Sequence, residues 1–149
     1  MQVAEVFGGL KMVWTEFPTE LSTVKIAPLS EVIARPTGSK SIATPEGGVA
    51  TEVGTPVEII SQTPEKGVTL HVAKATCACD TECLIEIKMG DEIIGWGWAN
   101  KYNTFIDWYP WGVSLEGDGN TKVSVIATAT LTVGTAYGTI FWEETPTES

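Results

Sequence analysis

The chain has 149 residues, of which 43% are hydrophobic, so it can build one well-buried core and is short for two domains. Its formal net charge at pH 7 is −10, and Arg35 is its one arginine. Binding to nucleic acid requires a basic patch that displaces counterions from phosphates. The charge therefore argues against a nucleic-acid partner.

No stretch reaches the roughly 18 apolar residues that a membrane-spanning helix needs, so no membrane partner is expected. The N-terminus lacks a basic segment followed by an apolar one, so we expect no signal peptide and synthesis in a cytoplasm. The three cysteines are an odd number, which cannot form a complete set of disulfides.

Residues 1–55 differ in composition from the rest of the chain. They are rich in Thr, Ser, Pro, Gly and Glu, and their short apolar segments (10–14, 24–26 and 32–34) are separated by proline or glycine. Because these interruptions prevent three turns of helix, we predict an extended N-terminal arm over 1–55 with strand-like pieces. The arm would lie on its own domain, on a neighbouring copy or on another protein, and the alternative is a flexible tail.

Residues 56–144 are dense in strand patterns and turn signals. From Cys83 to Met89, apolar and polar residues alternate as in a strand with one buried face, and no helical periodicity appears elsewhere. Short strands at this spacing must bury one face against a second sheet, which predicts an all-β, eight-stranded sandwich over 56–144 and a short C-terminal tail, 145–149. The expected strands are 57–62, 68–77, 83–89, 92–98, 104–108, 112–115, 122–131 and 137–143.

Two turns are expected to connect paired strands as hairpins. Residues 89–92 place Gly-Asp between two strand patterns, and residues 116–120 read Glu-Gly-Asp-Gly-Asn, which tolerates positive φ. The second turn would join strand 112–115 to strand 122–131.

Three stretches carry a resemblance to a known architecture. They are the strand–turn–strand of residues 60–70, the turn region 86–92, and residues 109–125, which run through a proline, an apolar strand, a glycine turn and a long strand. In this pattern the region resembles the eight-stranded jelly roll of small trimeric proteins that decorate or cement the heads of tailed phages, and more distantly tumour-necrosis-factor-like trimers. The resemblance is one of pattern and covers about 90 of the 149 residues.

The resemblance implies a non-enzymatic virion protein on the capsid surface. Its jelly roll would form a homotrimer, and its N-terminal arm would contact neighbouring subunits of the major capsid protein and hold them together. No catalytic residue and no cofactor is implied. The alternative is a β-sandwich module that binds a glycan or a receptor through a tryptophan-rich face.

The support for that alternative is the set of aromatic residues in the second half of the chain. Trp96 and Trp98 share one face of a predicted strand, and Trp108 and Trp111 follow closely. Exposed aromatic rings stack on sugars, so these four tryptophans are the candidate contacts for a glycan or a protein partner. The competing explanation is that the rings fill the core and a subunit interface, where tryptophan is enriched.

Cys77, Cys79 and Cys83 form the one cluster with reactive side chains. If residues 80–82 form a short loop, Cys79 and Cys83 face each other and a disulfide between them becomes geometrically feasible. Free, packed thiols are the main alternative, because buried cysteine behaves as a small hydrophobic residue. A metal site would need a fourth ligand such as His71 and lacks the usual pairs of closely spaced cysteines, so no metal is expected.

Other chemical sites have weak support in the sequence. Asp118 and Asn120 resemble part of a Ca²⁺ loop, but the glutamate at its twelfth position is missing and ordinary turn chemistry explains them. His71, the only histidine, lies in a predicted strand without a nucleophile motif nearby in sequence. We therefore expect no enzymatic activity.

Overall fold

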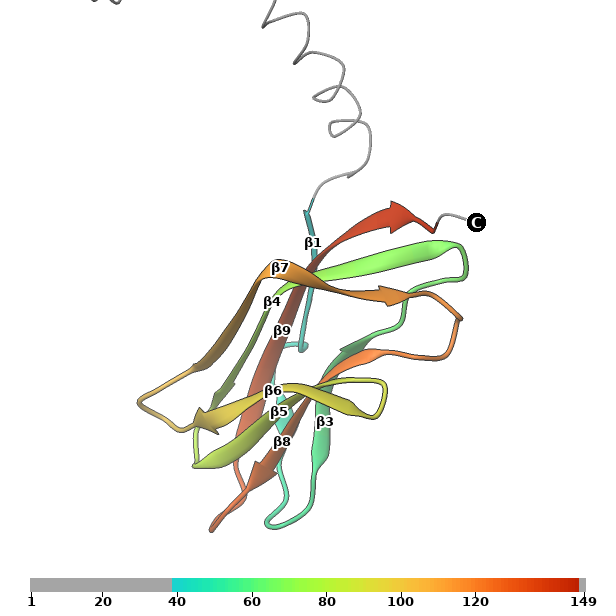
Figure 1. Ribbon diagram of the computed structural model, residues 1–149. Helices are drawn as coiled ribbons and strands as arrows, with labels where there is room; N and C mark the ends of the chain where they lie inside the picture. The colour runs from blue at the N-terminus through green and yellow to red at the C-terminus, as the bar shows by residue number, and fades with distance from the viewer. Residues whose placement is uncertain (1–38, 148–149) are drawn as a thin grey trace, which may run out of the picture. The chain divides into compact units, whose positions relative to one another are not determined.

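A computed structural model describes residues 39–147, which form strands and connecting turns (Figure 1). The nine strands of these residues pair in antiparallel fashion and no helix lies among them. They are β1 (Ser39–Ala43), β2 (Val49–Ala50), β3 (Val57–Gln62), β4 (Val68–Cys79), β5 (Cys83–Met89), β6 (Glu92–Ala99), β7 (Phe105–Glu116), β8 (Val123–Ala129) and β9 (Thr135–Pro146).

The strands form two sheets packed as a sandwich. One sheet has the order β1-β9-β4-β7, with β2 also paired to β9, and the other has the order β3-β8-β5-β6. The all-β sandwich expected from the strand patterns is therefore confirmed. Strands β6 and β7 are edges of different sheets and meet on the same side of the sandwich, where Gly97 of β6 faces Phe105 of β7.

The core between the sheets is built mainly from aliphatic side chains and cysteine. In β5 every second residue from Cys83 to Ile87 is fully buried, because alternate side chains of a strand point to the same face. Trp142 is the one aromatic side chain in the buried set of the described residues. That set comprises Ile59, Leu70, Val72, Ala75, Cys77, Cys79, Cys83, Ile85, Ile87, Ala99, Val123, Val125, Ala127, Ala129, Ala136, Ile140 and Trp142.

Strand β7 corrects one prediction from the sequence. The two strands expected at 104–108 and 112–115 form one element, in which two paired segments flank an irregular one. Val113 pairs with Val72 and Trp108 pairs with Lys74, so residues 109–112 of β7 lie opposite a single residue of β4. Gly112 has φ 74°, a conformation that glycine adopts without steric cost. The irregular segment explains why the sequence pattern broke there.

The turn at 116–120 is also not the hairpin that was expected. β7 and β8 belong to different sheets, so this connection crosses the sandwich. Asp118 holds the turn, because its carboxylate accepts hydrogen bonds from the backbone N–H groups of Asn120 and Thr121 at 2.7 and 2.6 Å. In contrast, the turn at Gly90 does join two paired strands, β5 and β6. The local sequence specified a turn at both places. Only the pairing of the flanking strands determined that the turn at Gly90 is a hairpin and that the turn at 116–120 is not.

Part of the segment expected to be an arm belongs to the sandwich. β1 pairs with β9 over five residues, and Ile42 packs against the core. The rest of the expected arm, residues 1–38, lies outside the described residues. At the other end, β9 continues to Pro146, which pairs with Val68 and extends into the segment expected to be a tail.

Candidate binding surfaces

Strand β6 presents two tryptophans to solvent. Its sequence alternates glycine and tryptophan, with Gly95 and Gly97 facing the interior and Trp96 and Trp98 facing outward. Trp96 is 64% exposed and Trp98 is 50% exposed. A side chain this apolar is costly to leave in water, and adjacent exposed tryptophans are typical of interaction surfaces. This part of the candidate set predicted from the sequence is therefore accessible in the isolated chain.

The surroundings of these tryptophans extend the surface across the sheet. Trp98 lies opposite Leu84 in the register of β5 and β6, and Trp96 lies opposite Glu86. Glu86 in turn lies opposite Ile126 of β8, so all of these side chains share the outer face of the sheet. We call Trp96, Trp98, Leu84, Glu86 and Ile126 the β6 face. It combines a largely apolar area with one carboxylate.

Trp108 lies on the outer face of the other sheet. It is 64% exposed, and the ammonium group of Lys74 lies 4.6 Å from the centre of its ring. The same ammonium lies 4.4 Å from the centre of the Phe141 ring, which places a cation between two aromatic side chains. Trp108 therefore does not join Trp96 and Trp98 in one platform. The four predicted tryptophans therefore do not form a single face. Trp111 belongs to the irregular segment of β7.

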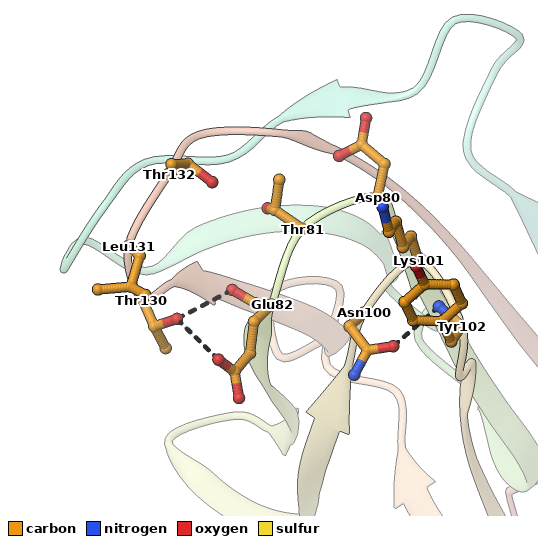
Figure 2. Close-up of a pocket in the computed structure, with 9 residues that line it drawn as sticks. All are labelled: Asp80, Thr81, Glu82, Asn100, Lys101, Tyr102, Thr130, Leu131 and Thr132. Carbon is orange, nitrogen blue, oxygen red and sulfur yellow. Dashed lines mark hydrogen bonds between the residues drawn. The ribbon is translucent and has the colours of Figure 1, made fainter.

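Three connections at one end of the sandwich form a pocket of about 490 Å³ (Figure 2). They are the turn between β4 and β5, the turn between β6 and β7, and the loop between β8 and β9. The lining residues are Asp80, Thr81, Glu82, Asn100, Lys101, Tyr102, Thr130, Leu131 and Thr132. No motif in the sequence predicts this pocket, because its residues come from three turns that lie far apart along the chain.

Hydrogen bonds hold the three connections in place. The backbone N–H of Thr135 donates to Asp80 at 2.8 Å, and the hydroxyl of Thr130 donates to the backbone carbonyl of Glu82 at 3.3 Å. The backbone N–H of Tyr102 donates to the Asn100 side chain at 2.8 Å, as Figure 2 shows. The pocket thus offers carboxylate and hydroxyl groups on a fixed frame, beside exposed apolar side chains.

The two cysteines proposed as a pair lie together at this end of the core. The Sγ atoms of Cys79 and Cys83 are 2.7 Å apart, and both residues are buried as free thiols, as is Cys77. β4 and β5 belong to different sheets, so the two sulfur atoms meet between the sheets and not across one ladder. Burial raises the pKa of Cys77 and of Cys83 to about 12, so both thiols are protonated at neutral pH.

His71 is held by two hydroxyl groups on the outer face of its sheet. Its Nδ1 lies 2.8 Å from the Ser114 hydroxyl and its Nε2 lies 2.8 Å from the Thr145 hydroxyl. A serine nucleophile needs a histidine that a carboxylate orients through its second nitrogen, whereas here a neutral hydroxyl occupies that position. These two contacts make His71 a polar bridge between β4, β7 and β9.

Metal-binding residues do not cluster in the described residues. Nowhere in residues 39–147 do three His, Cys, Asp or Glu side chains come together as a metal site would require. His71 and the three cysteines do not converge, and the carboxylate of Asp118 is engaged by its own turn. Over the same residues there is also no helix that could cross a membrane.

Comparisons with known proteins add no family to this description. No protein-family model and no curated protein matches the chain.

Proposed function

We propose that this protein is a non-enzymatic jelly-roll protein that decorates or cements a viral capsid as a homotrimer. The order of the strands supports the jelly roll. The two-residue β2 is left out here, and the eight remaining strands are numbered along the chain. One sheet then has the order 1-8-3-6, and the other has the order 2-7-4-5. This is the order of a long antiparallel hairpin folded into two Greek keys, an architecture that viral capsid proteins share with lectins.

The β6 face is the observation that carries the proposal of an assembly role. Two neighbouring tryptophans point into solvent from an edge strand, although the core of the same sandwich contains a single buried tryptophan among its described side chains. A monomer gains nothing from exposing such residues, whereas a subunit interface is stabilised by burying them. In the trimer, the β6 face would pack against neighbouring copies and the chain would be held on the capsid by the arm.

The arm contacts are proposed to come from residues 1–38. This segment precedes β1, which is fixed to β9, so any partner bound by the segment would be tied directly to the sandwich. The acidic net charge of −10 would suit a capsid surface with basic patches. The protein would be made in the host cytoplasm and would act on the virion surface.

Solution mass tests the trimer. Light scattering of the full chain is expected to give three times the monomer mass of 16.0 kDa. The double variant Trp96→Ser/Trp98→Ser should give a monomer that remains folded, since both side chains are at least half exposed. Leu131→Ser is the matched control, because Leu131 is 82% exposed at the end of the sandwich and its loss should leave the trimer intact. A monomeric wild-type chain would reject the trimer.

Co-sedimentation with capsids of the virus that encodes the protein tests decoration. The full chain is expected to bind, and a variant lacking residues 1–38 should remain trimeric and lose binding. Full binding by the truncated variant would reject the role of the arm. Absence of binding by the full chain would reject decoration itself.

A glycan-binding module is the second candidate function. It is favoured by the exposure of Trp96 and Trp98 at positions i and i+2, whose Cα atoms are about 7 Å apart on one face of a strand. Glu86 lies opposite Trp96 in the neighbouring strand. A glycan array with the full chain tests this candidate. Binding that is lost in Trp96→Ala/Trp98→Ala and retained in Tyr102→Ala would place the sugar on the β6 face, and the reverse result would place it in the pocket of Figure 2.

A further inference from the structure

Cys79 and Cys83 are placed as a disulfide would require, at the point where the chain crosses from one sheet to the other. Their Sγ atoms are 2.7 Å apart and both side chains face the core. A disulfide bond is about 2.05 Å long, so a small side-chain movement would bring the two sulfur atoms to bonding distance. Cys77 is also buried, but it lies two residues before Cys79 in β4, where its neighbours in the ladders are Phe105 and Gly138.

The turn between the two cysteines is already fixed by the structure around it. The Asp80 side chain accepts the backbone N–H of Thr135, and the backbone N–H of Thr130 donates to the carbonyl of Glu82 at 3.2 Å. The hydroxyl of Thr81 lies 3.9 Å from both sulfur atoms. Because both flanks of the turn are held, the sulfur atoms stay adjacent without help from the covalent bond.

We propose that Cys79 and Cys83 form an intramolecular disulfide that links the two sheets when the protein leaves a reducing cytoplasm, with Cys77 remaining a thiol. The cross-link would close the turn that carries Asp80, Thr81 and Glu82, which line the pocket of Figure 2. The timing rests on the proposed function, because a virion passes from a reducing cytosol to an oxidising medium. The pairing itself rests on the geometry alone.

The oxidation needs an external disulfide, which we take to be a small molecule such as oxidised glutathione. One cysteine thiolate attacks a sulfur of oxidised glutathione, which forms a mixed disulfide and releases one glutathione thiolate. The second cysteine thiolate then attacks the protein sulfur of the mixed disulfide and releases the second glutathione. Two protein thiols are oxidised, one glutathione disulfide is reduced to two thiols, and the two protein protons pass to the glutathione thiolates or to solvent.

Burial sets the rate of this reaction. Both cysteines are buried, and burial raises the pKa of Cys83 to about 12, so attack requires a transient opening of the turn. Oxidation should therefore be slow in native buffer and faster in a low concentration of denaturant. The same burial should protect the finished disulfide from reduction.

Thiol mapping of the full chain tests the pairing. The reduced protein is incubated with oxidised glutathione, alkylated in denaturant and cleaved on the N-terminal side of aspartate. Cleavage before Asp80 separates Cys77 and Cys79 from Cys83, so the disulfide is expected to join two peptides, with one alkylated cysteine in place of three. Three alkylated cysteines after prolonged oxidation in denaturant-free and mildly denaturing buffer would overturn the proposal.

Single substitutions identify the partners. Cys77→Ser should still form the cross-link, whereas Cys79→Ser and Cys83→Ser should not. The oxidised wild-type chain should melt about 5 °C above its reduced form, because a short closed loop restricts the unfolded chain, and Cys83→Ser should show no such difference. A cross-link that survives in Cys79→Ser would assign the bond to Cys77 and overturn the pairing. These results do not depend on capsid binding, so the pairing and the proposed function can fail separately.

Discussion

Gly97 of β6 lies directly against the ring of Phe105 of β7. A β-carbon added to Gly97 would lie 2.5 Å from Cε1 of that ring, which is closer than packed carbon atoms approach. Gly95 stands in the same relation to Asp107, whose carboxylate accepts the hydroxyl of Tyr109 at 3.0 Å. The two glycines leave room for β7 side chains to fill the side of the sandwich where the edge strands meet, while the tryptophans between and beside them point outward.

Gly97→Ala should therefore destabilise the protein by overpacking. We expect a loss of about 1–3 kcal/mol in the free energy of unfolding, measured by urea denaturation. The double variant Gly97→Ala/Phe105→Ala should lose less than the sum of the two single changes, because removal of the ring vacates the space that the new methyl group needs. Additive losses would show that the two residues are not in contact.

Two truncations should distinguish the ordered β1 from the residues before it. Removing residues 1–38 should leave a cooperative thermal transition, because every described strand is retained. Removing residues 1–50 should lower the free energy of unfolding by at least about 2 kcal/mol, since Ile42 and the pairing of β1 with β9 are lost. The longer truncation should also aggregate, because it exposes β9 as an unpaired edge. Equal stability of the two variants would contradict the packing of β1.

Asp118 should titrate well below an ordinary aspartate. The hydrogen bond from the Thr121 hydroxyl and those from the backbone N–H groups of Thr121 and Asn120 lower the pKa of Asp118 to about 2 from its ordinary value of 3.8. Because the folded state favours the ionised form, Asp118 stabilises the fold above about pH 4, and this contribution is lost as the pH falls toward about 2.

Carboxyl NMR measures this shift directly. The Asp118 resonance should titrate with a midpoint below 3, well under the ordinary 3.8, and Thr121→Val should move that midpoint upward because the hydroxyl donor is gone. A midpoint near 3.8 in the wild-type protein would exclude the hydrogen-bonded turn in solution.

Fluorescence quenching should distinguish three exposed tryptophans of the described residues from the buried Trp142. In dilute protein, acrylamide should quench Trp96, Trp98 and Trp108 strongly and Trp142 weakly, because Trp142 is only 5% exposed. Replacing the first three by Phe should therefore reduce the quenching constant, whereas Trp142→Phe should raise it. If the β6 face is a trimer interface, concentrating the wild-type protein should protect part of the emission. An unchanged constant in the triple variant would place those rings in the interior.

Local patterns determined much of the fold. β3 and β5 occur with the bounds that the strand patterns predicted. In β5 the signal is alternation, because a strand with one buried face needs an apolar residue at every second position. The all-β sandwich followed from the spacing of turn signals. The glycine-tryptophan alternation of β6 also placed Trp96 and Trp98 on one face, since the period of a strand is two residues.

The tertiary structure decided what lies opposite each strand. β7 pairs with β4 through both of the strands predicted there, so the two form one element across an irregular segment. The turn after β7 crosses the sandwich, because a turn sequence specifies a local bend and not the sheet of the next strand. The exposure of Trp96 and the burial of Trp142 likewise depend on which face is covered, a property that no single strand carries. The same holds for Cys79 and Cys83, which meet between the sheets because both sheets turn one face inward.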